Sequence, residues 1–218
     1  MSKVLFWNSQ SLKNKIPELS QYVEKHKIDI ILIAETWLTD KSKIYIPSFN
    51  CYRNDRSHGG VAIFIRKNIT HSSIRLISLN YADAIFLTVH GETTFTLGAI
   101  YCSPSASREQ AKTFFTQVLS ITGPCAIAGD FNAKHRSWNS DKNCRKGSDL
   151  AKLCDLKSFN IHGPDGPTLI PSRGLPSTVD FVLSKSIVGV TNPKTVNELS
   201  SDHFPILFTI PVSSKSPD

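Results

Sequence analysis

Short apolar segments with the features of strands alternate with a few amphipathic helices along this chain of 218 residues. The run KVLFWN, residues 3–8, is rich in apolar and aromatic side chains and predicts a strand that ends at Asn8. Apolar residues recur at helical spacing within Ile16–His26, where Pro17 is tolerated in the first turn. The run IDIILIAE, residues 28–35, predicts a second, buried strand. The chain therefore opens as a β-α-β unit.

The rest of the chain continues this alternation. Helices are predicted at Arg108–Ser120 and at Gly147–Lys157, the second with four side chains facing inward: Leu150, Leu153, Cys154 and Leu156. Strands bounded by turn signals are predicted in seven further segments: GGVAIFIRK (59–67), SSIRLISL (72–79), AIFLTVHG (84–91), TTFTLGAIY (93–101), PCAIAG (124–129), STVDFVLS (177–184) and HFPILFTI (203–210).

We expect these elements to form an α/β fold with two packed mixed β-sheets and helices on the outside, because that arrangement buries all of them. No repeat and no linker divides the chain, so residues 1–212 are expected to form a single domain. The polar end SSKSPD, residues 213–218, is expected to be a disordered tail.

Composition narrows the class of protein. With 40% hydrophobic residues the chain can bury a core without help from disulfide bonds or structural metal ions. Its five cysteines are odd in number and form no C-x-x-C pair, which favours a reducing compartment over a disulfide framework or a zinc site. The longest apolar stretch, Ile30–Ala34, is far too short to span a bilayer, and the N-terminus lacks a signal-peptide pattern. We expect a soluble, intracellular protein without a membrane partner.

The net charge of +7 and the pI near 9.2 fit a polyanionic partner. A basic protein that binds no polyanion would carry the same charge, so charge alone decides nothing.

Polar side chains suited to one reaction stand at the ends of several predicted strands. Taken singly, each is better explained as a turn former, a helix cap or a structural histidine. Buried ionised groups are costly unless they are paired or ligated, so their recurrence at separate strands asks for a shared explanation. We interpret eight residues as one metal-assisted catalytic site: Asn8, Glu35, Tyr101, Asp130, Asn132, Asp180, Asp202 and His203.

These residue types fit the hydrolysis of a phosphodiester. Mg²⁺ prefers hard oxygen ligands and often takes one or two carboxylates together with water and substrate phosphate. We expect Glu35 and Asp202 to be its protein ligands, so that the ion neutralises charge on the phosphate and on the leaving oxygen. Asp130 would orient or deprotonate the attacking water, and Asn132 would hold that water or a phosphate oxygen.

Two further side chains would act on the phosphate, and a third would act through one of them. His203 would donate to a phosphate oxygen, while Asp180 would fix the tautomer of His203 and favour its protonated form. Tyr101 would donate a hydrogen bond to the phosphate through its hydroxyl.

In chain order, the segments WNSQSL, IAETWL, AIYCSP, GDFNAKH, STVDFVLS and SSDHFPI resemble the motifs of the exonuclease–endonuclease–phosphatase superfamily. Within it the chain is most similar to the apurinic-endonuclease-like endonuclease domains of non-LTR (LINE-type) retrotransposons, on GDFNAKHRSWNS and RGLPSTVDFVLS. The resemblance implies a four-layered α/β sandwich. It also implies a divalent-metal-dependent endonuclease, using Mg²⁺ or Mn²⁺, that nicks double-stranded target DNA and leaves a 3′-hydroxyl to prime reverse transcription.

The same resemblance implies partners and a location. We expect double-stranded DNA as the target and a reverse transcriptase fused to this domain in a longer polyprotein. As an isolated domain it is expected to be a monomer, and its site of action is expected to be the nucleus.

One position departs from the superfamily pattern. Abasic-site repair enzymes carry an aspartate two residues after the first asparagine, as a further metal ligand, and Gln10 stands in that place. A neutral amide is a poorer magnesium ligand than a carboxylate, which weakens the repair hypothesis more than the nicking hypothesis. The alternatives are therefore an abasic-site DNA repair endonuclease, a phosphoinositide-type phosphatase of the same fold, and a binding module with a decayed site.

Basic and polar residues in loops that flank the site are the candidates for DNA binding, because backbone phosphates dominate affinity. After the GDFN segment they are Lys134, His135, Arg136, Trp138, Lys142, Arg145 and Lys146. Taken singly, each charged residue is better explained as a solvated surface group, and Trp138 as a packing residue.

A hairpin turn is predicted at Ser172-Arg173-Gly174. In the family that the chain resembles, a hairpin just before the equivalent of Asp180 reaches into DNA. Arg173 is therefore expected to enter a minor groove. A plain surface turn explains the same residues equally well.

Overall fold

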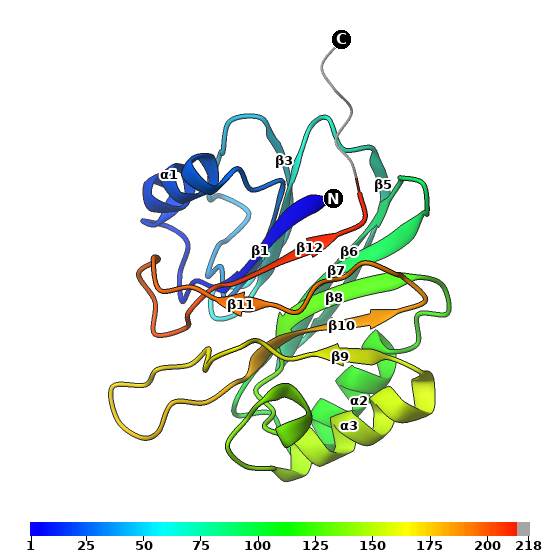
Figure 1. The fold of residues 1–218 in the computed structure, drawn as a ribbon. Helices are drawn as coiled ribbons and strands as arrows, with labels where there is room; N and C mark the ends of the chain where they lie inside the picture. Colours follow the sequence, from blue (N-terminus) through cyan, green and yellow to red (C-terminus); the bar gives the residue numbers. More distant parts are fainter. Residues whose placement is uncertain (213–218) are drawn as a thin grey trace.

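The computed structural model describes residues 1–212, and the predicted tail, residues 213–218, lies outside the described residues. Two six-stranded sheets pack face to face (Figure 1). The first has the order β11-β12-β1-β2-β4-β3, and these strands span Lys194–Thr195, Ile206–Ile210, Ser2–Asn8, Ile30–Ala34, Val61–Arg66 and Phe49–Asn54. The second has the order β5-β6-β7-β8-β10-β9, and these strands span His71–Leu79, Ala82–Val89, Phe95–Cys102, Cys125–Asp130, Asp180–Lys185 and Asn160–His162.

Each sheet is mixed, because one parallel pair, β1–β2 in the first and β7–β8 in the second, stands among antiparallel pairs. The helices within residues 1–212 are α1 (Ile16–His26), α2 (Arg108–Val118), α3 (Arg145–Lys157) and the short 3₁₀ helix η1 (Arg136–Trp138). α1 covers the outer face of the first sheet, and α2 and α3 cover the outer face of the second (Figure 1). This confirms the predicted four-layered α/β sandwich.

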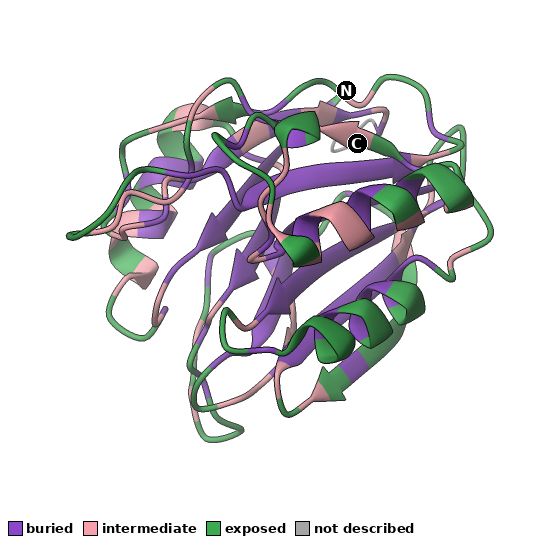
Figure 2. Ribbon diagram, turned by 90° about the horizontal axis from the view of Figure 1, so that it is seen from below, coloured by how far each residue is buried: buried purple, intermediate pink, exposed green. Residues whose placement is uncertain are grey.

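The apolar pattern of the strands explains the layers. The strand IILIA of β2 is buried along its whole length because the first sheet is covered on both faces. Residues such as Leu32 and Leu97 fill the space between the sheets. Leu19 and Val23 of α1 pack on the first sheet, and Phe114 of α2 packs on the second. Figure 2 shows the strands buried and the outer faces of the helices exposed.

The structure corrects the sequence prediction in a few places. Three strands, β3, β9 and β11, were not predicted. β9 and β11 are very short, and β3 (FNCYRN) lies at an edge of the sheet beside β4 and has no regular alternation of polar and apolar residues. Leu156 does not face inward, since it is 76% exposed. Asp180 begins its strand rather than lying inside it.

None of the helices within residues 1–212 combines the length and apolar character that crossing a bilayer requires.

Candidate active site

Strand pairing brings the predicted site residues together from both sheets. In the first sheet, Asn8 at the end of β1 pairs in register with Ala34, which directly precedes Glu35. In the second, Asp130 at the end of β8 lies between Tyr101 of β7 and Asp180 of β10. Since strand ends on one edge of a sheet lie side by side, the register places these polar groups at one rim of each sheet.

Asn8 joins the two sheets. Its side chain is almost fully buried, and its amide nitrogen donates to Glu35 Oε1 and to Asp130 Oδ2, each at 2.9 Å. Its carbonyl oxygen accepts from the backbone N–H of Gln10 at 3.1 Å. One carboxamide therefore fixes two carboxylates that come from different layers of the fold.

Asp130 is fully buried and held on several sides. The backbone and side-chain N–H groups of Asn132 donate to its two oxygens at 3.0 and 2.9 Å. Asn132 is itself fixed, because it adopts a left-handed backbone (φ 45°) and donates to the carbonyl of Cys102 at 3.0 Å. At Gly129 a Cβ would come within 2.2 Å of Ile100, so only glycine allows this approach of β8 to β7.

Burial, and after it the neighbouring charge of Asp180, raises the pKa of Asp130 to about 8. The positive charge of His203 lowers the pKa of Asp130 and so partly opposes this rise. His203 Nδ1 lies 2.9 Å from Asp180 Oδ2, with both side chains buried. Burial alone would lower the pKa of His203, but the neighbouring carboxylates, that of Asp180 before those of Asp130 and Asp202, together raise it to about 10. His203 is therefore protonated at neutral pH, with Asp180 as its partner.

Tyr101 lies beside these groups in a nearly buried position. Burial, and then the charges of Glu35 and Asp130, raise the pKa of its phenol well above the ordinary value. The hydroxyl therefore keeps its proton and can donate a hydrogen bond.

Two residues that the sequence did not single out also hold the site. Trp37 Nε1 donates to Glu35 Oε2 at 3.1 Å, so both oxygens of Glu35 have partners. Ser201 Oγ donates to the backbone carbonyl of Asn8 at 2.9 Å and accepts from the N–H of His203 at 3.2 Å. Trp37 lies in the motif IAETWL and Ser201 in SSDHFPI, so their places beside Glu35 and His203 in the sequence could have indicated their roles.

The residues present fit a divalent cation. Atoms of Asp130, Asp180 and His203 lie within 4.8 Å of one another, and because His203 is protonated, the two carboxylates are the members of this group that can face an ion. Buried oxygens of Asp180 and Asp202 have no hydrogen-bond partner, which is costly unless something else satisfies them. Carboxylate oxygens are the donors that Mg²⁺ prefers. Neither Glu35 nor Asp202 belongs to the three-residue group, and their assignment as the ligands stays a prediction.

Some of the predicted DNA-binding residues are accessible at the surface, and others are engaged in contacts within the protein. Arg136, Arg145 and Arg173 are exposed, and Lys134 and His135 are partly exposed. Leu169 and Ser177 pair at the base of the predicted hairpin that carries Arg173.

The structure contradicts the prediction that Trp138 binds DNA. This residue is fully buried, stacks on Phe181 with ring centroids 4.5 Å apart and donates from Nε1 to the carbonyl of Ala133. A side chain packed in this way cannot contact DNA directly. The Lys146 ammonium is likewise engaged, since it donates to the carbonyls of Pro104 and Ala106.

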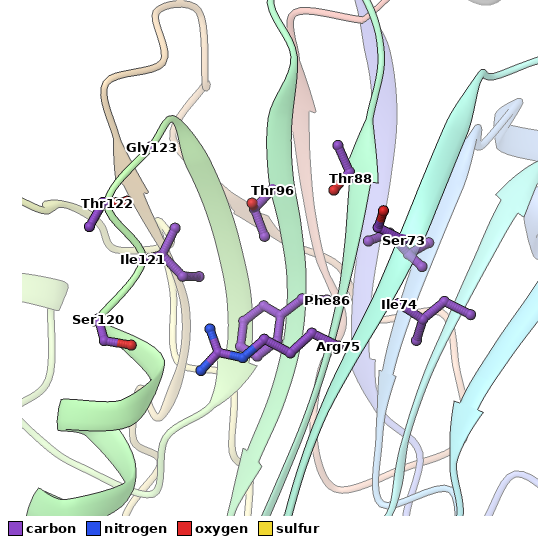
Figure 3. A pocket seen from close by; sticks show the side chains of 11 residues that line it. Ser73, Ile74, Arg75, Phe86, Thr88, Thr96, Ser120, Ile121, Thr122 and Gly123 are labelled. Carbon is purple, nitrogen blue, oxygen red and sulfur yellow. The ribbon is translucent and has the colours of Figure 1, made fainter.

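A hollow of about 360 Å³ lies elsewhere on the molecule, between β5–β7 and the residues that follow α2. Figure 3 shows the Arg75 side chain extending across it beside Phe86. No acidic side chain or histidine lines this hollow, so it is not the candidate active site.

The fold and this cluster of acidic groups, asparagines and a histidine define the class of protein. The chain belongs to the Endonuclease/Exonuclease/phosphatase family, whose model matches residues 5–203. It is 32% identical to a probable RNA-directed DNA polymerase from transposon X-element and 31% identical to the RNA-directed DNA polymerase from mobile element jockey, both of Drosophila melanogaster. These matches cover 95% and 94% of the chain but 24% and 23% of the relatives, so the chain spans about a quarter of their length.

Solved structures agree on the fold. The endonuclease domain of TRAS1, a telomere-specific non-LTR retrotransposon, superposes with a TM-score of 0.79 at 20% identity, over 97% of this chain and 99% of that one. An AP endonuclease from Archaeoglobus fulgidus superposes with a TM-score of 0.73 at 14% identity, over 97% and 100%. The resemblance inferred from the sequence is confirmed, and family membership supports a nuclease role.

Proposed function

We propose that this chain is a divalent-metal-dependent endonuclease that nicks double-stranded target DNA and leaves a 3′-hydroxyl to prime reverse transcription. One observation carries the proposal. Asn8 ties Glu35 and Asp130 together across the two sheets, beside the His203–Asp180 pair. This arrangement supplies acidic oxygens for an ion, a base for water and a cationic donor for a phosphate at one place.

Each side chain would have a defined part. In its ionised form, which a nearby divalent cation would favour over the protonated form, Asp130 would accept a proton from the attacking water, and Asn132 would help to hold that water. The water oxygen forms a bond to phosphorus as the P–O3′ bond breaks, and the leaving O3′ takes up a proton from solvent, giving a 5′-phosphate and a 3′-hydroxyl. Protonated His203 would donate to a phosphate oxygen, with Asp180 holding its Nδ1.

Glu35 and Asp202 are the proposed ligands for Mg²⁺, or Mn²⁺ in its place. When bound, the ion neutralises the charge that develops on the phosphate and the leaving oxygen. Tyr101, whose phenol keeps its proton, would donate to the phosphate from the side of the second sheet.

The relatives support a wider proposal. Two of them are RNA-directed DNA polymerases of mobile elements that extend far beyond the matched region. We therefore propose that the domain acts together with a reverse transcriptase in the same polypeptide, on double-stranded DNA in the nucleus. Arg136 and Arg145 are the proposed phosphate contacts, since they are exposed at the starts of η1 and α3, and exposed Arg173 on the hairpin is proposed to enter a minor groove.

The direct test is nicking of a supercoiled plasmid with Mg²⁺, with chelator as the control. The nicked product should be extended by a DNA polymerase without phosphatase treatment, because its 3′ end is a hydroxyl. Asp130→Ala and His203→Ala should abolish nicking while circular dichroism stays native. Full activity in either variant would refute the assigned roles.

The same protein separates the alternatives. A strong preference for an oligonucleotide with one abasic site over intact duplex would favour repair. Release of inorganic phosphate from an inositol phosphate without nicking would favour a phosphatase. Binding of duplex without cleavage under any divalent metal would favour a binding module.

A further inference from the structure

A second group of charged side chains lies between the sheets, outside the candidate active site. Asp83 on β6 is fully buried, and its Oδ2 accepts from the backbone N–H of Gly60 at 2.8 Å and lies 2.8 Å from Arg56 Nη2. Its Oδ1 accepts from Ser78 Oγ at 3.4 Å. A buried ion pair gains little stability, because desolvation offsets the attraction. This pair is better explained by what it holds in place.

The pair bridges the two sheets. Asp83 belongs to the second sheet, where it lies opposite Tyr101 in the β6–β7 register. Arg56, Gly59 and Gly60 belong to the segment that joins β3 to β4 in the first sheet. The fit is tight, because a Cβ on Gly59 would come within 2.9 Å of Asp83 Oδ2 and within 2.6 Å of Arg56 Nε.

The same segment also forms backbone hydrogen bonds to the two residues that follow Glu35. The carbonyls of Gly60 and Gly59 accept from the backbone N–H groups of Thr36 and Trp37, at 3.3 and 3.0 Å. Glu35 and Trp37 both adopt left-handed backbone conformations, with φ of 50° and 49°. Such conformations are unfavourable for residues with a Cβ and persist where the surroundings enforce them. The N–H groups of Ser11 and Leu12 hold the carbonyls of Glu35 and Thr36 on one side, and the Gly59 and Gly60 carbonyls hold the N–H groups of Thr36 and Trp37 on the other.

We propose that Arg56 and Asp83 are positioning residues that hold Glu35 in place through Gly59 and Gly60. The inference rests on the proposed function, since it assigns Glu35 a role in binding the divalent ion. It goes beyond that function by adding two residues that touch neither the ion nor the substrate. Their loss should displace Glu35 while the remainder of the acidic cluster stays in position.

Trp37 gives a readout that is independent of nicking. Of the three tryptophans, Trp7 and Trp138 are fully buried, whereas Trp37 is 37% exposed. Its indole N–H donates to Glu35 Oε2 at 3.1 Å. Acrylamide quenching therefore reports on Trp37 in the metal-free protein, and quenching by Mn²⁺ reports on an ion beside Glu35.

The test is Asp83→Asn, which keeps the shape of the side chain and removes the charge that faces Arg56. Acrylamide quenching of the metal-free variant should rise, and its Mn²⁺ affinity should fall by about 10- to 100-fold, as for other residues that orient a metal ligand. The matched control is Asp149→Asn, which breaks the Arg108–Asp149 pair between α2 and α3 and should change neither quantity.

A second background shows whether the effect passes through Glu35. In Glu35→Gln, adding Asp83→Asn should change Mn²⁺ affinity little further. An equal loss in both backgrounds would overturn the proposal, as would native Mn²⁺ affinity and native quenching in Asp83→Asn. If wild type neither nicks DNA nor binds Mn²⁺ near Trp37, the proposed function itself fails, which is a separate outcome.

Arg56→Gln keeps the test decisive if Asp83→Asn does not fold. The Arg56 side chain is 21% exposed, so water can reach the replacement, and the Asp83 carboxyl that it leaves without a partner can take up a proton. The same loss of Mn²⁺ affinity with native circular dichroism would support the proposal. Loss of folding in both variants would assign the pair to stability alone and overturn it.

Discussion

Replacing Asn8 by alanine tests whether one side chain organises the site across both sheets. The substitution removes two hydrogen bonds donated to carboxylates, each 2.9 Å long. Hydrogen bonds to charged groups contribute about 1.5–3 kcal/mol each. The substitution therefore removes roughly 3–6 kcal/mol of the interactions that hold the two carboxylates in position. At tenfold in rate for about 1.4 kcal/mol, nicking should slow by roughly 10²- to 10⁴-fold.

Stability should respond much less than activity. Asn8→Ala leaves Asp130 with its bonds from Asn132, and the free energy of unfolding should fall by about 1–3 kcal/mol. The matched control is Ser2→Ala at the other end of β1, where a buried hydroxyl donates to the carbonyl of Val212 at 2.9 Å. This control should lose about 1 kcal/mol and nick normally.

The assay is single-turnover nicking of a supercoiled plasmid, with denaturant unfolding of the same samples. Nicking by Asn8→Ala within threefold of wild type, in protein that is folded, would refute the view that this carboxamide sets the positions of Glu35 and Asp130. Equal losses of activity in Asn8→Ala and Ser2→Ala would trace the effect to stability instead.

Three further predictions follow from other contacts. Because Asp180 raises the pKa of His203 to about 10, their contact contributes stability that is fully present below the unfolded pKa of about 6.5 and is lost as the pH rises through 10. The difference in unfolding free energy between wild type and Asp180→Asn should therefore shrink from pH 6 to pH 10, and a constant difference would argue against the charged pair. Trp138→Ala should lower the free energy of unfolding by about 3–5 kcal/mol in denaturant titrations, since it empties a fully buried site; a change below 1 kcal/mol would contradict this packing role. Arg173→Ala should weaken DNA binding with unchanged stability, because it removes the cation proposed to enter a minor groove, whereas unchanged affinity would show that Arg173 does not contact DNA.

The layers of the fold could be predicted because each element carries its own periodicity. α1 was predicted with its observed bounds, since Leu19, Tyr22 and Val23 mark one face and the helix is short. Leu156 shows the limit of that reasoning. It lies six residues after Leu150, about 240° around an α-helix, and therefore points away from the face that Leu150 buries. Whether an apolar helix residue faces the core therefore depends on its angle around the helix axis relative to the buried residues.

The proximity of the candidate site residues could be inferred because each stands at the end of a strand, and strand ends at one edge of a sheet lie side by side. Asn8, Glu35 and Asp130 are joined by hydrogen bonds as that inference requires. The support around them could not be inferred. Asp83 and Arg56 meet across two sheets through a loop, and no local pattern of residues signals such a contact. Trp138 was harder to place because it stands in a polar segment, where burial depends on the distant ring of Phe181.

The charge balance explains why these groups belong together. Four carboxylates, those of Glu35, Asp130, Asp180 and Asp202, face two cationic groups, the imidazolium of His203 and, beside Asp202, the ammonium of Lys15, so full ionisation would leave an excess of negative charge in a largely buried volume. Like charges at such distances cannot all stay ionised, and a raised pKa at Asp130 is the expected response. A proton and a divalent cation therefore relieve the same repulsion. The buried oxygens of Asp180 and Asp202 that lack a partner show that protein donors leave part of it unrelieved. The feature that makes this rim costly to fold is thus the one that gives it affinity for a cation.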